Sequence, residues 1–190
     1  MASYSTSDFK KGLKVQLEGE PYLMIDMDFM KPGKGQAVYR VKLKGLVSGR
    51  VLDKSYRSGD SLESADVEEK GMQFLYKDAE HFHFMDGESF EQYEVAEDKV
   101  GDAAKWLVDE MQVDVVFWDG NPITVTAPHH VDLEVTYTEP GAKGNSTGNV
   151  QKPATVQTGA EIMVPTFINL KDIVRIDTRT GLYIERVSKG

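Results

Sequence analysis

Two extended-looking stretches joined by a short turn-forming segment decide how this chain folds. Residues 22–30 read YLMIDMDFM, and the segment that follows, residues 31–37, reads KPGKGQA. Residues 38–45 then read VYRVKLKG, in which apolar side chains alternate with Arg40, Lys42 and Lys44. Alternation with a period of two is typical of a strand with one buried face. Two such stretches joined by a segment rich in Pro and Gly predict a β-hairpin.

Lys34 lies at the centre of the predicted turn. Pro32 fixes its own φ angle and lacks a backbone donor, whereas Gly33 and Gly35 permit left-handed or tightly bent backbone. The turn therefore presents the Lys34 amine without a bulky neighbour, although a lysine at a hairpin tip is most often only a solvated turn residue. A phosphate-binding P-loop does not fit, because Gly35 follows Lys34 where that motif needs Ser or Thr.

The composition is that of a soluble folded protein. Of the 190 residues, 40% are hydrophobic and 28% charged, which suits one large domain or two to three small ones. The sequence has no apolar run long enough to span a membrane and no signal peptide at its start. Cysteine is absent, so disulfides, thiolate nucleophiles and cysteine-type zinc sites are excluded. We therefore expect a cytoplasmic protein with no membrane association.

The net charge of −9 is unevenly distributed. Residues 1–64 carry 11 Lys/Arg against 8 Asp/Glu, a net charge of +3. Residues 65–127 carry 4 against 16, a net charge of −12, and residues 128–190 carry 7 against 7. An acidic middle third can simply confer solubility. The same distribution also lets the chain present a basic N-terminal part to RNA and turn the acidic part away.

Strand and turn signals predict an all-β chain of three small β-barrels in an elongated arrangement. We expect an SH3-like (KOW-type) barrel in residues 1–64, ending at the polar cluster 58–64, and OB-fold barrels in residues 65–127 and 128–190. One helix is predicted in the middle barrel, with Asp98 as its N-cap. Its apolar face is given by helical spacing, at Val100, Ala103, Ala104, Leu107, Val108 and Met111.

No catalytic or metal-binding constellation stands out. His81 and His83 are two residues apart and share a strand face, but no third metal ligand accompanies them. His129 and His130 are a weaker pair. The many carboxylates guarantee accidental Asp/Glu pairs, and neither a nucleophile elbow nor a zinc-binding helix motif is present. We expect a non-enzymatic protein that needs no cofactor and no metal.

With three barrels and one displayed lysine, the chain resembles bacterial elongation factor P over essentially its whole length. The segment 31–37 resembles the loop that carries the modified residue of this family, and residues 101–107, GDAAKWL, resemble its middle-domain helix. Near the C-terminus, KPA at 152–154, IMVP at 162–165 and DTRTGLYIER at 177–186 are similar to its signature segments. Two departures are Lys171, where the signature ends in glycine, and Asn145-Ser146, where many members have Asp-Thr.

The resemblance implies a monomeric translation factor that binds the 70S ribosome between the P and E sites and relieves stalling at consecutive prolines. Lys34 corresponds to the residue that a lysine-modifying enzyme extends. The tRNA-contacting loop comprises Lys31, Pro32, Gly33, Gly35 and Gln36. Contacts with the ribosome or the E-site mRNA are implied for Gly144, Asn145, Ser146, Tyr183 and Arg186. The partners implied are thus the ribosome, the P-site tRNA, the E-site mRNA and the modifying enzyme.

Alternatives remain open from the residues alone. A paralogue of the factor with another ribosomal task would share the fold, and a general RNA-binding β-barrel protein would bind single strands through basic grooves and stacked aromatics. An enzyme that forms a Schiff base through Lys34 is disfavoured. That chemistry needs a desolvated amine of lowered pKa, and a glycine-flanked tip does not provide one.

Overall fold

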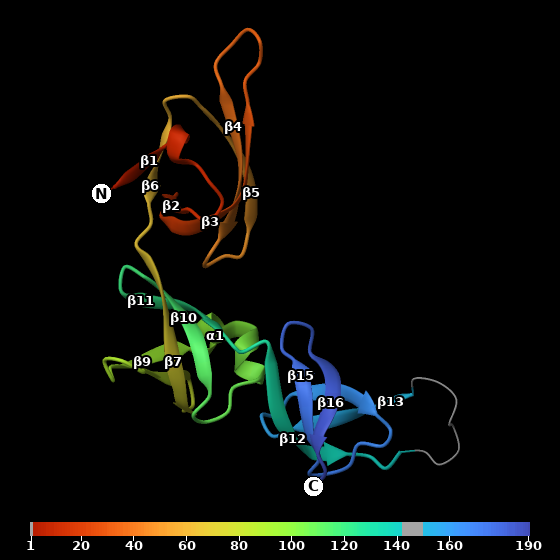
Figure 1. Cartoon of the computed structure of the whole chain (residues 1–190). Helices are drawn as coiled ribbons and strands as arrows, with labels where there is room; N and C mark the ends of the chain where they lie inside the picture. Colours follow the sequence, from red (N-terminus) through yellow and green to blue (C-terminus); the bar gives the residue numbers. More distant parts are fainter. Residues whose placement is uncertain (1, 142–149) are drawn as a thin grey trace. The chain divides into compact units, whose positions relative to one another are not determined.

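The computed structural model describes residues 2–141 and 150–190, which are almost entirely strands and turns (Figure 1). The strands form one six-stranded sheet and two five-stranded sheets. The predicted all-β class is therefore confirmed. Within the described residues, no helix has the length and apolar character needed to cross a membrane.

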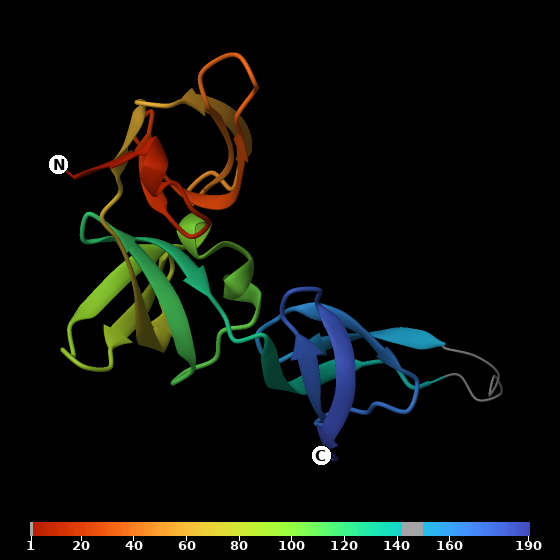
Figure 2. The same ribbon diagram turned by 45° about the horizontal axis from the view of Figure 1, so that its top comes forward.

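The first sheet has the strand order β1-β6-β2-β3-β4-β5 and curls around its own core (Figure 2). A short 3-10 helix, η1 (Thr6–Asp8), follows the first strand. The strands are β1 (Ser3–Ser5), β2 (Lys14–Leu17), β3 (Glu20–Met30), β4 (Val38–Gly45), β5 (Val51–Arg57) and β6 (Ser61–Ser64).

The alternation in residues 38–45 explains the core of this sheet. Val41 and Leu43 are buried, whereas Arg40, Lys42 and Lys44 between them are exposed. Each fully buried aliphatic side chain contributes roughly 1.5–3 kcal/mol relative to an exposed one. The buried members of this core are Phe9, Leu13, Val15, Tyr22, Met24, Val41, Leu43 and Leu62.

The polar cluster 58–64 contains a strand that the sequence did not predict. Strand β6 pairs with both β1 and β2, so it belongs to the first sheet. Ser, Asp and Glu dominate this segment, and only Leu62, at 6% exposure, reaches the core. A strand with one apolar residue shows no alternation of apolar and polar residues in the sequence. Its strand conformation is stabilised instead by backbone pairing with β1 and β2.

The second sheet has the order β11-β10-β7-β8-β9 and the third has the order β14-β13-β12-β15-β16. The second consists of β7 (Val67–Lys77), β8 (His81–Asp86), β9 (Gln92–Ala96), β10 (Gln112–Trp118) and β11 (Asn121–Thr126). The third consists of β12 (His130–Thr138), β13 (Gln151–Val156), β14 (Glu161–Pro165), β15 (Ile173–Asp177) and β16 (Leu182–Ser188).

The two five-stranded sheets share one topology, although we find no sequence repeat between them. In each, the first strand is central, the second and fourth flank it, and the third and fifth form the edges. In the third sheet, the edge strands β14 and β16 also approach each other. Closing edges in this way removes unpaired strand borders and is typical of small barrels such as the OB-fold.

The predicted helix from Val100 to Met111 is wrong in length. The structure has one α-helical turn, α1 (Glu97–Val100), followed by a 3-10 turn, η2 (Gly101–Lys105). Gly101 has φ +60° and ψ −137°, a conformation outside the helical region that ends α1. Residue Ala96, not Asp98, is the N-cap. Of the six apolar residues at helical spacing, three are buried and three are half-buried, although the backbone that carries them is irregular. The buried ones are Val100, Ala103 and Leu107, and the half-buried ones are Ala104, Val108 and Met111.

The contacts divide the chain into two compact units, residues 1–70 with 115–124 and residues 71–114 with 125–190. Inside the second unit, the Thr158 hydroxyl donates to the Lys105 carbonyl oxygen at 2.6 Å. A Cβ atom added at Gly181 would lie 3.7 Å from the ring of Trp106. The boundaries near residues 64 and 127 stay predictions, because compact contacts do not show which segments fold independently.

Candidate functional site

The β3–β4 hairpin displays Lys34 at its tip. Paired residues run from the sheet to the last pair, Met30 and Val38, and the connection 31–37 follows without further pairing (Figure 1). Every residue from Lys31 to Gln36 is exposed. The sequence-predicted loop residues therefore lie together in one protruding segment. A primary amine placed there can enter a narrow site on a partner.

Two features determine the conformation of this loop: the backbone at Gly35 and a hydrogen bond at its base. Gly35 has φ +140°, a conformation that L-residues rarely adopt, so the glycine after Lys34 is required by the backbone. Gly33 does not have a positive φ angle, so only one of the two predicted glycine roles is realised. At the base, the Ser58 backbone N–H donates to the Ala37 carbonyl oxygen at 3.1 Å, which ties the loop to the end of β5.

A row of aromatic rings connects the hairpin to the core of the first sheet. Phe29 and Tyr39 face each other across β3 and β4, with ring centroids 5.0 Å apart. Tyr39 lies edge-on to the buried Phe9 at 6.1 Å, and Phe9 lies edge-on to Tyr56 at 5.6 Å. Such pairs contribute about 0.5–1.5 kcal/mol each beyond the area they bury. The hairpin is thus an extension of the core and not a loose flap.

A shallow hollow lies at the foot of the Lys34 loop. It has a volume of about 380 Å³ and is lined by Met30, Lys31, Pro32, Val38 and Arg40. Three of these residues are apolar and two are cationic. A lining that combines apolar and cationic side chains is suited to a ligand that has both a flat apolar part and a phosphate.

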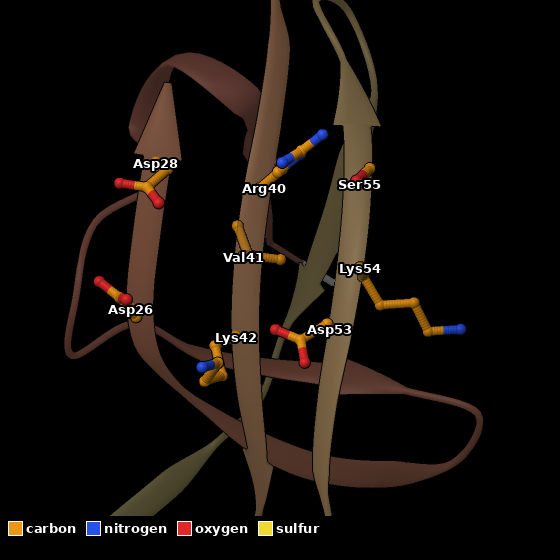
Figure 3. Close-up of a pocket in the computed structure, with 8 residues that line it drawn as sticks. All are labelled: Asp26, Asp28, Arg40, Val41, Lys42, Asp53, Lys54 and Ser55. Carbon is orange, nitrogen blue, oxygen red and sulfur yellow. The ribbon is translucent and has the colours of Figure 1, made fainter. Parts of the chain in front are cut away.

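The outer face of β3, β4 and β5 carries both signs of charge (Figure 3). Asp28 lies opposite Arg40, and Lys42 lies between Asp26 and Asp53 in the strand register. These residues line a second depression of about 450 Å³. The excess of Lys and Arg in residues 1–64 is therefore not concentrated on this face, where carboxylates balance it.

Of the predicted C-terminal contact residues, Tyr183 and Arg186 are both in β16, opposite the buried Ile176 and Val174. The Arg186 Nη1 atom donates to Oδ2 of the buried Asp172 at 3.3 Å, and its guanidinium lies 5.1 Å from the ring centre of Phe167. Burial raises the pKa of Tyr183. Arg186 therefore has a structural partner already. Gly144, Asn145 and Ser146 lie outside the described residues.

Asp78 joins the two histidines that the sequence suggested as a pair. His83 Nε2 lies 2.6 Å from Asp78 Oδ2, and His81 Nδ1 lies 4.0 Å from Asp78 Oδ1. The His83 ring is stacked on Tyr76, with centroids 4.4 Å apart. Hydrogen bonds from His83 and from the backbone N–H groups of Glu80 and His81 hold the pKa of Asp78 well below its usual range. In residues 2–141 and 150–190, no three His, Asp or Glu side chains are grouped to hold a metal ion.

The aromatic support of the hairpin was missed by sequence reasoning. Phe29 and Tyr39 are the residues next to the last pair on each side of the loop, Met30 and Val38. Two aromatic residues placed symmetrically about a predicted turn would have indicated a cross-strand pair. The link through Phe9 could not be found in this way, because Phe9 lies outside both strands.

Family models match three successive parts of the chain. Residues 5–62 match the elongation factor P KOW-like domain, residues 67–125 the elongation factor P OB domain, and residues 131–186 the elongation factor P C-terminal domain. The KOW-like and OB-type architecture expected for the chain is thereby confirmed.

Relatives of known name agree with these matches. Elongation factor P of Pectobacterium atrosepticum is 50% identical over 187 residues, covering 98% of this chain and 100% of that protein. Elongation factor P of Rhodopirellula baltica is 51% identical over 188 residues, covering 99% and 96%. Among solved structures, translation initiation factor 5A from Methanococcus jannaschii has a TM-score of 0.55 at 20% identity, covering 66% of this chain and 92% of that one. An initiation factor 5A family protein from Naegleria fowleri has a TM-score of 0.54 at 16% identity, covering 66% and 95%. These two structures bear on the fold alone.

Proposed function

The chain belongs to the elongation factor P family of translation elongation factors, and from that premise we propose that it binds the 70S ribosome between the P and E sites and promotes peptide-bond formation at consecutive prolines. The proposal has one central residue, Lys34. The observation that supports it best is the exposed Lys34 loop at the end of a hairpin braced by aromatic contacts.

The proposed mechanism is positioning of a slow substrate. Peptidyl-prolyl-tRNA reacts slowly because proline is conformationally restrained. A factor that orders the acceptor end of the P-site tRNA lowers the barrier without supplying an acid or a base, so the protein acts without being an enzyme. In favourable cases, orientation alone contributes up to roughly 7–11 kcal/mol. Accurate positioning needs a rigid support, which the row from Phe29 through Tyr39 to Phe9 provides.

Lys34 suits this task because its side chain ends in a primary amine. A modifying enzyme can extend such an amine by acylation or alkylation, which a guanidinium does not permit in the same way. The exposed loop 31–36 gives an enzyme access to the amine from several sides. The extension lengthens the reach of the hairpin toward the reacting centre.

The tRNA contact is assigned to the foot of the same loop. Lys31 and Arg40 line this hollow together with Pro32 and place two cations at the foot of the loop that displays the Lys34 amine. Phosphate contacts by such cations give affinity and make it dependent on salt. Lys42 is a poorer candidate, since Asp26 and Asp53 flank it in the register. Contact with the E-site mRNA is assigned to the segment with Gly144, Asn145 and Ser146, and ribosome contact to Tyr183.

A reconstituted translation reaction tests the function. Synthesis of a reporter with a run of prolines is followed with and without the purified, natively modified protein, beside a matched reporter in which the prolines are alanines. We expect the protein to accelerate the proline reporter only. Equal acceleration of both reporters would point to a general RNA-binding role, and acceleration of neither would contradict the proposal.

A further inference from the structure

The turn between β8 and β9 displays an aromatic ring in water. Phe90 is 68% exposed, more than any other large apolar side chain in the part of the chain described. Strand β9 is an edge strand of the second sheet, so the turn lies at a sheet border (Figure 1). A single exposed apolar residue needs no explanation in itself. The surroundings of Phe90 distinguish it from such a residue.

The turn holds Phe90 in a fixed place. Asp86 is 6% exposed, and its Oδ1 atom accepts hydrogen bonds from the backbone N–H groups of Glu88 at 2.8 Å and Ser89 at 3.3 Å. The Phe90 N–H donates to the Asp86 carbonyl oxygen at 3.0 Å, and the Asp86 N–H donates to the Glu91 carbonyl oxygen at 2.9 Å. A turn whose backbone is held in this way loses little conformational freedom when it binds a partner.

The Phe90 backbone makes this placement costly. Its φ angle is +61°, in the left-handed region that bulky residues rarely occupy. Glycine would adopt this conformation without steric cost. Exposure of the ring to water and the left-handed backbone both make a large aromatic residue unfavourable at this position. A benefit to stability does not account for the ring.

The charges around Phe90 have one sign. From residue 78 to residue 98 the chain has eight Asp and Glu and neither Lys nor Arg. Glu88 and Glu91 flank the ring in sequence and are exposed, and the Tyr93 hydroxyl donates to Glu91 Oε2 at 2.8 Å, which fixes that carboxylate. An aromatic anchor inside a carboxylate rim complements an apolar recess bordered by Lys and Arg. The same rim repels a phosphate backbone.

We propose that the Phe90 tip, defined as residues 86–91, is a docking element for a basic protein surface, with the ring inserted into an apolar recess and Glu88 and Glu91 facing Lys or Arg side chains. The proposal rests on the proposed ribosome binding, and the partner is then a Lys- and Arg-rich protein of the ribosome and not its RNA. It adds a second contact that is independent of Lys34.

Two substitutions test the tip with purified 70S ribosomes. Phe90→Gly relieves the backbone and removes the ring, so we expect a melting temperature at or above that of the parent and ribosome affinity weakened at least about tenfold in co-sedimentation. Glu88→Lys reverses one rim charge, and Glu80→Lys makes the same change at an exposed position before β8, at the end of that strand opposite the tip. We expect Glu88→Lys to weaken binding and Glu80→Lys to change it much less.

The outcomes separate this proposal from the proposed function. If the parent binds ribosomes and accelerates proline reporters while Phe90→Gly binds equally well, the docking role is overturned and the function stands. Tighter binding by Glu88→Lys means that the tip faces RNA and overturns the proposal as well. Failure of the parent itself to bind ribosomes overturns both.

Discussion

Phe29 and Tyr39 lie directly opposite each other in the β3–β4 ladder, one residue pair below the loop that carries Lys34, with their rings tilted by 56° and their centroids 5.0 Å apart. Phe29 is 52% exposed, so burial alone does not explain its place. This aromatic pair, called the clamp below, packs the two strands together just before the loop begins. It connects the placement of Lys34 to the core through Phe9.

The clamp predicts that Phe29→Ala impairs function more than stability. We expect a loss of about 0.5–1.5 kcal/mol in the free energy of unfolding, measured with urea, because one exposed aromatic pair is removed. Rescue of a proline reporter should fall several-fold, since the loop is less well fixed. Val51→Ala is the matched control, because Val51 is 51% exposed on β5 of the same sheet. Equal rescue by both variants would show that the clamp has no functional role.

The contact between Arg186 and Asp172 predicts a structural role for this arginine. Asp172 is 2% exposed and also accepts the backbone N–H groups of Asn169 at 2.9 Å and Gly190 at 3.2 Å. Arg186→Ala leaves this buried carboxylate without its cation, so we expect about 2–4 kcal/mol of destabilisation by urea unfolding. Arg179→Ala, whose side chain is 57% exposed in its pair with Asp177, should destabilise the fold much less, because water screens an exposed ion pair. Equal costs for the two variants would argue against this account of Arg186.

Lys171 has φ +67°, which explains why the family signature ends in glycine at this position. We expect Lys171→Gly to raise the free energy of unfolding by up to about 1 kcal/mol, the left-handed strain being partly offset by the freedom that glycine gains in the unfolded chain. Lys171→Ala is the control, since it removes the charge but keeps Cβ and the strain. A gain with Ala as large as that with Gly would mean that charge, and not backbone, matters here.

The Asp78–His83 contact predicts a dependence of stability on pH. The folded-state pKa of Asp78 lies below the ordinary 3.8, chiefly because His83 hydrogen-bonds to its carboxylate. Stability from this ionised carboxylate is therefore present above pH 3.8 and lost as the pH falls below it toward the folded pKa. Urea unfolding of Asp78→Asn should show a deficit near neutral pH that shrinks in acid. Asp114→Asn, an exposed change on β10, should show no such trend, and a deficit in Asp78→Asn that is constant with pH would count against the contact.

The sequence predicted the displayed lysine well because Pro32, Gly35 and the alternation through Val41 and Leu43 are local signals. The predicted helix failed for a local reason too, since helical spacing at Val100 and Ala103 masks the break at Gly101. Strand β6 was out of reach because Leu62 alone connects it to the core.

The supporting contacts were also out of reach. Phe9, Tyr39 and Tyr56 are distant in sequence, and only the curled sheet brings their rings together. In the same way, the partner of Arg186 is a buried carboxylate on a preceding loop, which makes this residue look like a free surface cation in the sequence.

Rescue of proline synthesis by Lys34 variants tests the central claim most directly. Protein from its native cell, with intact mass recorded to establish the modification, is compared with Lys34→Ala and Lys34→Arg in a translation reaction on a proline-run reporter, with thermal melting measured beside it. We expect the free energy of unfolding of both variants to stay within about 0.5 kcal/mol of the parent value, because the exposed tip makes few contacts, so their melting curves should be close to that of the parent. Both variants should lose most of the rescue. Full rescue by Lys34→Ala would contradict the account and leave Lys34 as a turn residue only.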